Sequence, residues 1–196
     1  GVDVAVLDLR PRPAPDAGAR GSFEANGPFG LPAADVFLLC QGMIPSFDFE
    51  AKLILERPDR IFTNPDGHGG SLTALLGSGA LDDMERRGIT TIFYYQVDNP
   101  LVELADPVFL GFHAAGAAMR CKSLRKRKPE EKMGVFARTD GQICVVEYTE
   151  ITPEHRDARD ATGRLVYDAG NLAVHAFEVD FVRRVAADRN ADVHQY

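Results

Sequence analysis

The stretch Asn64-Pro65-Asp66-Gly67-His68-Gly69-Gly70 is the part of the sequence from which the fold is best inferred. Its three glycines have no Cβ, so a ligand can come close to the backbone. The following segment, Ser71-Leu72-Thr73-Ala74-Leu75-Leu76, predicts a helix with Ser71 as its N-cap and leucines along one face. Free N–H groups at such a helix start favour an anion or a nucleotide base, and a tight surface turn is the alternative.

A predicted strand downstream favours a ligand site. Residues 89–96 are apolar and rich in β-branched and aromatic side chains, and Val97-Asp98-Asn99 follows them. The Asp98 carboxylate is therefore expected at the carboxyl end of a buried strand, where open α/β sheets hold their ligands. Its alternative is to cap the segment after the strand.

The bulk composition is that of an ordinary globular protein. The 196 residues are 45% hydrophobic and 26% charged, with a formal net charge of −7. This acidity argues against a broad nucleic-acid surface, and no apolar run reaches the roughly 20 residues that span a bilayer. We find no signal peptide, and we expect Cys40, Cys121 and Cys144 to be buried free thiols in a reducing cytoplasm.

The chain divides by pattern into two regions. Residues 1–22 carry prolines and glycines that disrupt regular structure, and we interpret them as an irregular arm with at most a short strand at its start. Residues 23–196 read as one α/β domain that begins with a continuous apolar strand at 36–40. Later signals include helical sequence over 71–87 with a break near Gly77 and Gly79, a helix that opens at Asp106-Pro107, and an Asp140-Gly141 hairpin.

Five motifs carry a family resemblance. They occur in the order Gln41-Gly42-Met43, Pro65–Gly70, Val97-Asp98-Asn99, Val146–Glu150 and Asp168–Asn171. With these motifs the chain resembles the UDP-sugar pyrophosphorylases, most closely their UDP-N-acetylhexosamine branch, over about residues 23–185. The resemblance implies a Rossmann-like (GT-A-like) nucleotidyltransferase fold, a mixed sheet flanked by helices and here incomplete at both ends. It also implies a cytoplasmic uridylyltransferase that converts UTP and a hexose 1-phosphate to a UDP-sugar and pyrophosphate.

The family likeness assigns roles around the nucleotide. Gln41 resembles the amide that hydrogen-bonds the uracil edge, and Gly67 resembles the backbone contact to the same base. Gly42, Pro65 and Asp66 belong to the same nucleotide-binding motifs. Asp98 resembles the catalytic carboxylate that holds Mg²⁺ between the phosphates. From the residues alone, Gln41 could instead satisfy a loop backbone at a strand end.

The likeness also assigns sugar contacts. Glu147 and Tyr148 resemble the pair that faces the sugar hydroxyls and the N-acetyl group, and Asn171 resembles a sugar-contacting amide. His68 and Gly69 belong to the same set, although a histidine at position 68 looks more like the glucose-type relatives. Because Glu147-Tyr148 matches the N-acetylhexosamine branch, N-acetylglucosamine 1-phosphate is the expected substrate, and glucose 1-phosphate is the alternative. Without the resemblance, Glu147 reads as an exposed edge residue and Asn171 as a turn former.

Two elements of the family pattern have no counterpart in this sequence. One is the glycine-rich, arginine-containing loop that cradles the UTP phosphates, and the other is a later lysine that neutralises them. The basic run of residues 124–132 could hold phosphate or form a solvated loop. We therefore expect little turnover from this chain alone, and a non-catalytic UDP-sugar-binding module is the rival interpretation. The sequence leaves the oligomeric state open.

Overall fold

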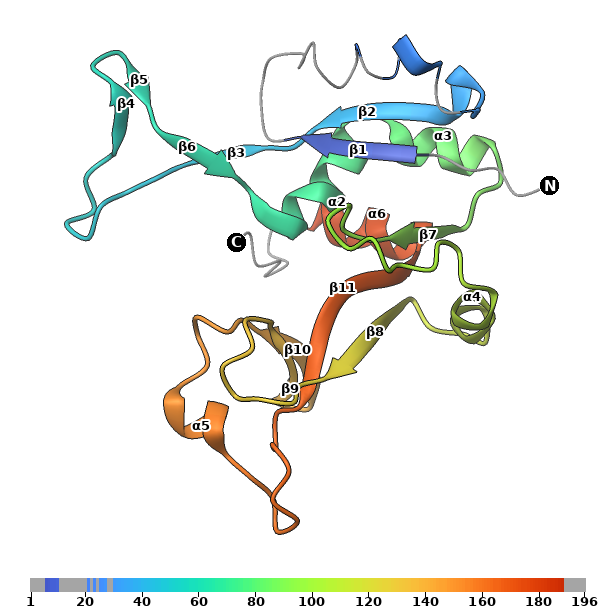
Figure 1. Ribbon diagram of the computed structural model, residues 1–196. Helices are drawn as coiled ribbons and strands as arrows, with labels where there is room; N and C mark the ends of the chain where they lie inside the picture. Colours follow the sequence, from blue (N-terminus) through green and yellow to red (C-terminus); the bar gives the residue numbers. More distant parts are fainter. Residues whose placement is uncertain (1–5, 11–20, 22, 24, 28–29, 189–196) are drawn as a thin grey trace. The chain divides into compact units, whose positions relative to one another are not determined.

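The computed structural model describes residues 6–10, 21, 23, 25–27 and 30–188, and these form two compact units (Figure 1). The first unit comprises residues 1–90 together with 179–196, and the second comprises residues 91–178. This division falls elsewhere than the boundary that we drew at residue 22. Within that predicted arm, Val6–Arg10 forms a strand, and most of the remaining arm lies outside the described residues.

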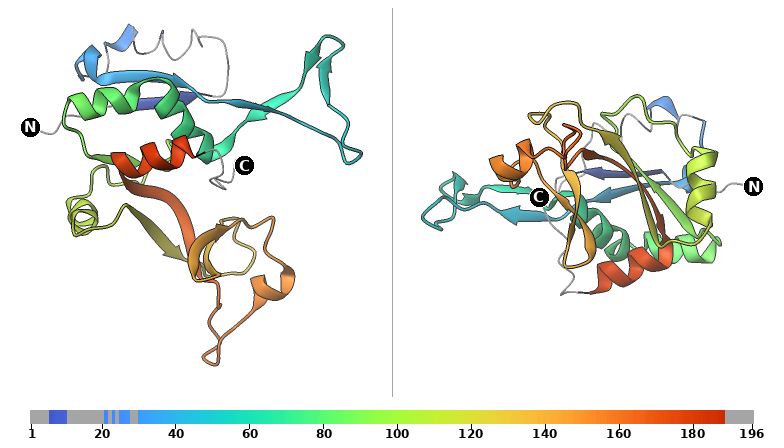
Figure 2. Two further views of the ribbon diagram at one scale, coloured as in Figure 1. Left: turned by 180° about the vertical axis from the view of Figure 1, so that it is seen from behind. Right: turned by 90° about the horizontal axis from the view of Figure 1, so that it is seen from below.

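The first unit combines three small two-stranded sheets with helices. Strand β1 (Val6–Arg10) pairs in parallel with β2 (Val36–Cys40), which confirms the apolar strand predicted at 36–40. The other elements are η1 (Ala33–Asp35), β3 (Met43–Pro45), β4 (Leu55–Arg57), β5 (Arg60–Ile61), β6 (Thr63–Pro65), α2 (Gly67–Gly77), α3 (Ala80–Arg86) and α6 (Val179–Ala187). Strand β3 pairs antiparallel with β6, and the two lead into a hairpin that carries β4 and β5 (Figure 2).

The core of the first unit lies where α2, α3 and α6 meet. Leu81 and Val182 are fully buried there, beside Leu75 and Met84. The break predicted near Gly77 and Gly79, within the helical residues 71–87, is confirmed at Gly79, whose φ of +78° only glycine adopts readily. The interruption turns one long helix into α2 and α3, and both helices bury an apolar face against α6.

The second unit is built on one five-stranded antiparallel sheet in the order β10-β9-β11-β7, with β8 also paired to β11. Its elements are β7 (Thr91–Tyr94), α4 (Pro107–Ala114), β8 (Met119–Arg125), β9 (Val135–Thr139), β10 (Gln142–Val146), α5 (Pro153–Asp157) and β11 (Ala169–Glu178). The hairpin predicted at Asp140-Gly141 is confirmed, since both residues have the positive φ that a tight turn of this kind requires.

Aromatic side chains of β7 pack against rings on β11 and on α4. The ring of Tyr94 stacks on His175 at a centroid distance of 5.9 Å, and Phe177 contacts both rings. On the α4 side, Phe93 meets Phe109 edge to face at 6.1 Å. The two units together give the mixed α/β architecture that the sequence predicts.

Two local predictions are wrong. Ser71 is not the N-cap of its helix: α2 begins at Gly67, Asp66 is the N-cap, and Ser71 is buried inside the first turns. Cys40 is exposed rather than buried, because it is the last residue of β2. Cys121 and Cys144 are partly buried free thiols, and burial raises the pKa of Cys121 to about 11. Among the described residues, no helix is long and apolar enough to cross a bilayer.

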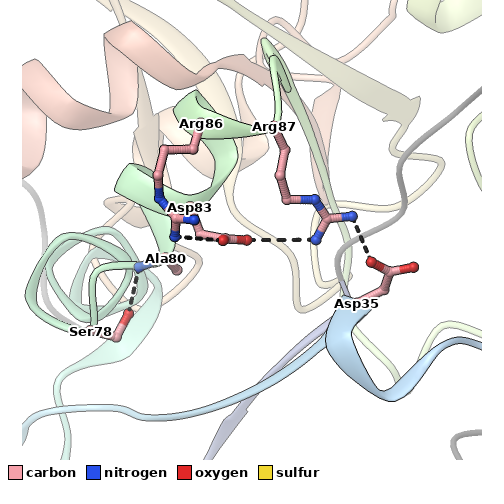
Figure 3. A network of polar contacts seen from close by, with 6 residues as sticks. All are labelled: Asp35, Ser78, Ala80, Asp83, Arg86 and Arg87. Atoms are coloured by element: carbon pink, nitrogen blue, oxygen red, sulfur yellow. Dashed lines mark hydrogen bonds and ion pairs between the residues drawn. The ribbon is translucent and has the colours of Figure 1, made fainter.

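Neighbouring arginines at the end of α3 offer a matched test of what an ion pair contributes (Figure 3). Arg87 is 19% exposed and reaches Asp35 at 2.6 Å and Asp83 at 3.6 Å, whereas Arg86 is 73% exposed and pairs with Asp83 at 2.7 Å. Arg87→Ala leaves the half-buried Asp35 without its cation, so we expect the free energy of unfolding to fall by about 1–3 kcal/mol. Arg86→Ala should lower the free energy of unfolding by less than about 0.5 kcal/mol. Urea titrations followed by circular dichroism measure both losses. Equal losses in the two variants would contradict this assignment.

A second prediction concerns acid stability and Asp106, the N-cap of α4. The Lys122 ammonium donates to its carboxylate at 2.5 Å, and together with the backbone N–H groups of Val108 and Phe109 it lowers the pKa of Asp106. A lowered folded-state pKa gives stability that is present above the unfolded value and is lost as the pH falls through the folded value.

Asp106→Asn keeps a good N-cap but cannot ionise. We therefore expect the variant to be less stable than the wild type at neutral pH and to lose less stability on acidification below about pH 4. Thermal melts across pH 3–7 measure this. The exposed Asp59→Asn, in the turn between β4 and β5, serves as the control. Parallel stability curves for Asp106→Asn and the wild type would contradict the prediction.

Candidate functional site

The predicted base-binding residues meet at one corner of the first unit. Gln41 follows β2, and Gly67 begins α2. The antiparallel pairing of β3 with β6 joins them, because Met43 lies opposite Pro65 and the Asp66 N–H donates to the Gly42 carbonyl at 3.0 Å. Residues that are about 25 positions apart in the chain therefore lie side by side.

A direct hydrogen bond fixes the Gln41 side chain in this corner. Its Nε2 donates to the Gly67 carbonyl. An amide carries donors on one side and an acceptor on the other, so this bond leaves Oε1 as the acceptor. The arrangement can accept a hydrogen bond from a ring N–H.

The glycine-rich stretch is the start of a helix rather than a loop. Gly67 turns the chain with a φ of +70°, and Gly69 and Gly70 are buried in the first turn of α2. His68 and Pro65 are exposed at the surface of this corner. The first N–H groups of α2 receive no side-chain cap from Asp66. The bare backbone that the sequence predicts is therefore present at the helix N-terminus.

Asp66, predicted to contact the nucleotide, has its side chain buried at 7% exposure. Its carboxylate lies against Gly42 and Gly70: a Cβ on Gly42 would come within 2.2 Å of Oδ2, and one on Gly70 within 1.7 Å of Oδ1. These two glycines are therefore needed by a side chain of the protein itself. Asp66 belongs to the corner, but it forms part of the packing beneath the surface.

Three of the predicted sugar-binding residues, Glu147, Tyr148 and Asn171, lie in the second unit, whereas His68 and Gly69 lie in α2 of the first unit. Glu147 follows β10, and Asn171 lies in β11. Gly134, just before β9, connects them: its carbonyl accepts from the Asn171 N–H at 2.8 Å, and a Cβ at this position would lie 3.0 Å from Glu147 Oε1. Tyr148 is 46% exposed and directly follows Glu147. The cluster offers a carboxylate, a phenol and an amide.

A bulge in β11 orients Asn171. The register of β11 against β8 shifts between Asn171 and His175, and Ala173 has a φ of +51°. This left-handed conformation is uncommon for a residue other than glycine and is frequent at functional sites. Asn171 Oδ1 accepts from the Ala173 N–H at 3.0 Å, which leaves Nδ2 as the donor.

Asp98 is exposed in the turn after β7, four residues beyond the end of that strand. No group of three His, Cys, Asp or Glu side chains in the described part of the chain is placed to hold a metal ion. One carboxylate with substrate phosphates is nevertheless an ordinary ligand set for Mg²⁺. The donor at Asp98 therefore fits the predicted ion, and its role stays a prediction.

The basic run forms a braced loop after β8. Arg125 pairs with Asp168 at 3.0 Å, while Lys126 is buried and donates from Nζ to the Pro129 carbonyl at 3.2 Å. The N–H groups of Arg127 and Lys128 both donate to the Glu131 carboxylate. The run thus ends in an ordered turn that leads to Gly134, which contacts both Glu147 and Asn171.

Sequence reasoning missed Gly134. The residue is a single glycine between Met133 and β9, outside any glycine-rich motif, so no sequence motif marks it as a functional residue. Its signal is positional, since a single glycine directly before a strand often marks a close approach of another group. Here that group is the Glu147 side chain.

Residues 30–195 match the protein family described as UTP–glucose-1-phosphate uridylyltransferase. UDP-N-acetylhexosamine pyrophosphorylase-like protein 1 from Homo sapiens is 43% identical over 167 residues, which are 85% of this chain and 33% of that protein. UDP-N-acetylglucosamine diphosphorylase 2 from Arabidopsis thaliana is 42% identical over 84% of this chain and 34% of its own length. The chain thus spans about a third of the curated relatives it matches.

A solved structure shows the same fold. The uridine diphosphate N-acetylglucosamine pyrophosphorylase from Trypanosoma brucei, crystallised with an inhibitor, aligns with a TM-score of 0.78 at 31% identity. The alignment covers 90% of this chain and 36% of that one. The predicted nucleotidyltransferase fold is confirmed.

The close contact at Gly134 gives a testable prediction. A methyl group there would lie 2.8 Å from Val145 Cγ1 as well as against Glu147, so Gly134→Ala should lower the free energy of unfolding by about 1–3 kcal/mol. Gly111→Ala, in α4 with open space around it, is the matched control and should cost nothing, because alanine is the better helix former. Urea unfolding of both variants measures the difference. Wild-type stability of Gly134→Ala would show that the contact is not tight.

Proposed function

The chain belongs to the UTP–glucose-1-phosphate uridylyltransferase family, and from that premise we propose that it forms the base- and sugar-binding part of a UDP-N-acetylhexosamine pyrophosphorylase. The proposed reaction converts UTP and N-acetylglucosamine 1-phosphate to UDP-N-acetylglucosamine and pyrophosphate. The hydrogen bond from Gln41 to the Gly67 carbonyl is the observation that carries the proposal.

The corner at Gln41 suits uracil. Uracil presents an N–H at ring position 3 between two carbonyl groups, whereas cytosine presents an acceptor at the same position. With Nε2 held by Gly67, Gln41 Oε1 accepts from the uracil N–H. The first N–H groups of α2 supply donors for a uracil carbonyl, and Gly67, which has no Cβ, lets the ring approach them.

The cluster in the second unit suits an N-acetylated hexose. Glu147 accepts from sugar hydroxyls, and Asn171 donates from Nδ2 because its Oδ1 is taken by Ala173. Tyr148, half exposed beside Glu147, offers an aromatic face to the acetyl group. The two relatives that share about 43% and 42% of their aligned residues with this chain carry N-acetylhexosamine or N-acetylglucosamine in their names, which favours this sugar over glucose.

Uridylyl transfer proceeds by attack of a sugar-phosphate oxygen on the α-phosphorus of UTP. The bond from that phosphorus to the bridging oxygen breaks, and pyrophosphate leaves. Asp98 would hold Mg²⁺ together with phosphate oxygens of the substrate, and the bound ion would supply positive charge at the phosphates. Transfer also needs further cations around the phosphates, and we assign that role to none of the described residues. The 196 residues are therefore expected to bind UDP-sugar in the cytoplasm but to catalyse its formation only slowly on their own.

Calorimetry can separate the proposed base contact from the proposed sugar contact. We expect Gln41→Ala to weaken the binding of both UDP and UDP-N-acetylglucosamine by about tenfold or more, because one well-placed hydrogen bond is lost from each complex. Glu147→Gln should weaken UDP-N-acetylglucosamine to a similar degree and leave UDP unchanged, since only the sugar contacts are affected.

Glu154→Gln on α5 is the control, an exposed glutamate outside the predicted set, and it should bind both ligands like the wild type. A pyrophosphate-release assay with UTP, Mg²⁺ and N-acetylglucosamine 1-phosphate accompanies the titrations. Binding without release would favour a UDP-sugar-binding module. Absence of UDP binding by the wild-type chain would defeat the proposal.

A further inference from the structure

We propose that Asp66 is a positioning residue that holds Gln41 and Gly67 in the geometry needed to read the base, without itself touching the ligand. The inference rests on the proposed uridine-binding function. It assigns to Asp66 a different task from the direct nucleotide contact that the sequence motif suggests.

The Asp66 side chain is 7% exposed, and its Oδ1 is out of contact with solvent. Among the described residues, Oδ1 has no hydrogen-bond partner. A ligand at the surface of the corner cannot reach an atom in this place. A buried polar atom of this kind carries a free-energy cost, and residues that bear such a cost are frequently kept for a function.

The Asp66 carboxylate is held tightly between two glycines. It lies between Gly42, directly before β3, and Gly70 in the first turn of α2, at distances that leave no room for a Cβ on either residue. The Asp66 N–H adds a backbone hydrogen bond to the Gly42 carbonyl. Asp66 therefore joins strand and helix through its side chain and its backbone together.

The residues that Asp66 joins are the immediate neighbours of the base-reading pair. Gly42 directly follows Gln41, and Gly67 directly follows Asp66. A shift of Asp66 would change the separation of Gln41 from Gly67 and break the hydrogen bond between them. Base reading depends on such fixed geometry, since a small displacement of a hydrogen-bonding group loses most of its binding energy.

The position of Asp66 also bears on what the helix terminus can hold. The positive end of the α2 dipole favours negative charge, and a carboxylate of the protein already stands there as the N-cap residue. This arrangement favours an uncharged ring over a phosphate at the start of α2, beside Gly67. It decides between the two ligand types that the glycine stretch alone leaves open.

A pair of substitutions can separate positioning from simple packing. Gly70→Ala places a methyl group against the Asp66 carboxylate, and Asp66→Ala removes that carboxylate. We would prepare both single variants, the double variant, and Gly77→Ala as a control at a helical glycine of α2 with open space around it. Each chain is characterised by its Tm, by calorimetry with UDP, and by the Gln41 side-chain amide signals in nitrogen-15 NMR spectra.

Gly70→Ala should lower the Tm by roughly 2–8 °C, and the added Asp66→Ala should recover most of that loss. UDP affinity should nevertheless stay at least about tenfold below wild type in all three variants, because none of them holds the carboxylate in place. The Gln41 amide signals should shift in the same three variants. Gly77→Ala should bind UDP like the wild type.

The inference is overturned if Asp66→Ala binds UDP within twofold of the wild type, or if the double variant regains affinity together with stability. The second result would mean that Asp66 matters only as a neighbour that must not clash. If the wild-type chain binds no UDP, the proposed function fails separately. The ligand-free amide signals of Gln41 then decide: a shift in Asp66→Ala supports the positioning role, and unchanged signals reject it.

Discussion

The short antiparallel pairing of β3 with β6 is the constraint on which the candidate base site depends. Its register sets Met43 opposite Pro65, and one step further it sets Gly42 opposite Asp66. A slip by one residue would turn every side chain of one strand to the other face and would separate Gln41 from Gly67. The pairing is only three residues long, so the side chain of Asp66 and the amide of Gln41 add contacts where the ladder ends.

Glycine has the same role in both units: it makes room for a polar side chain of the protein. Gly42 and Gly70 accommodate Asp66 in the first unit, and Gly134 accommodates Glu147 in the second. In each case one of these glycines adjoins a residue that the family resemblance assigns to ligand binding: Gly42 directly follows Gln41, and the Gly134 carbonyl accepts from the Asn171 N–H. The missing Cβ of these glycines therefore leaves space for side chains of the protein itself, in addition to the space that glycine can leave for a ligand.

Sequence patterns predicted the elements well where one local signal dominates. The apolar run that became β2, the Asp106 cap of α4 and the Asp140-Gly141 hairpin are each specified by a few neighbouring residues. The start of α2 was misplaced because glycine is a poor helix former, and burial of Gly69 and Gly70 outweighs that local preference. Gly134 and the buried place of Asp66 depend on contacts between distant segments, which no local pattern encodes.

The central claim is that the fixed amide of Gln41 selects a uridine nucleotide, and a comparison of UDP with CDP tests it most directly. The two ligands differ only at the base edge that Gln41 Oε1 is proposed to read. Calorimetric titration of the wild-type chain should give a Kd for UDP at least about tenfold lower than for CDP, since cytosine offers an acceptor where a donor is needed. Equal affinities for UDP and CDP would contradict the account.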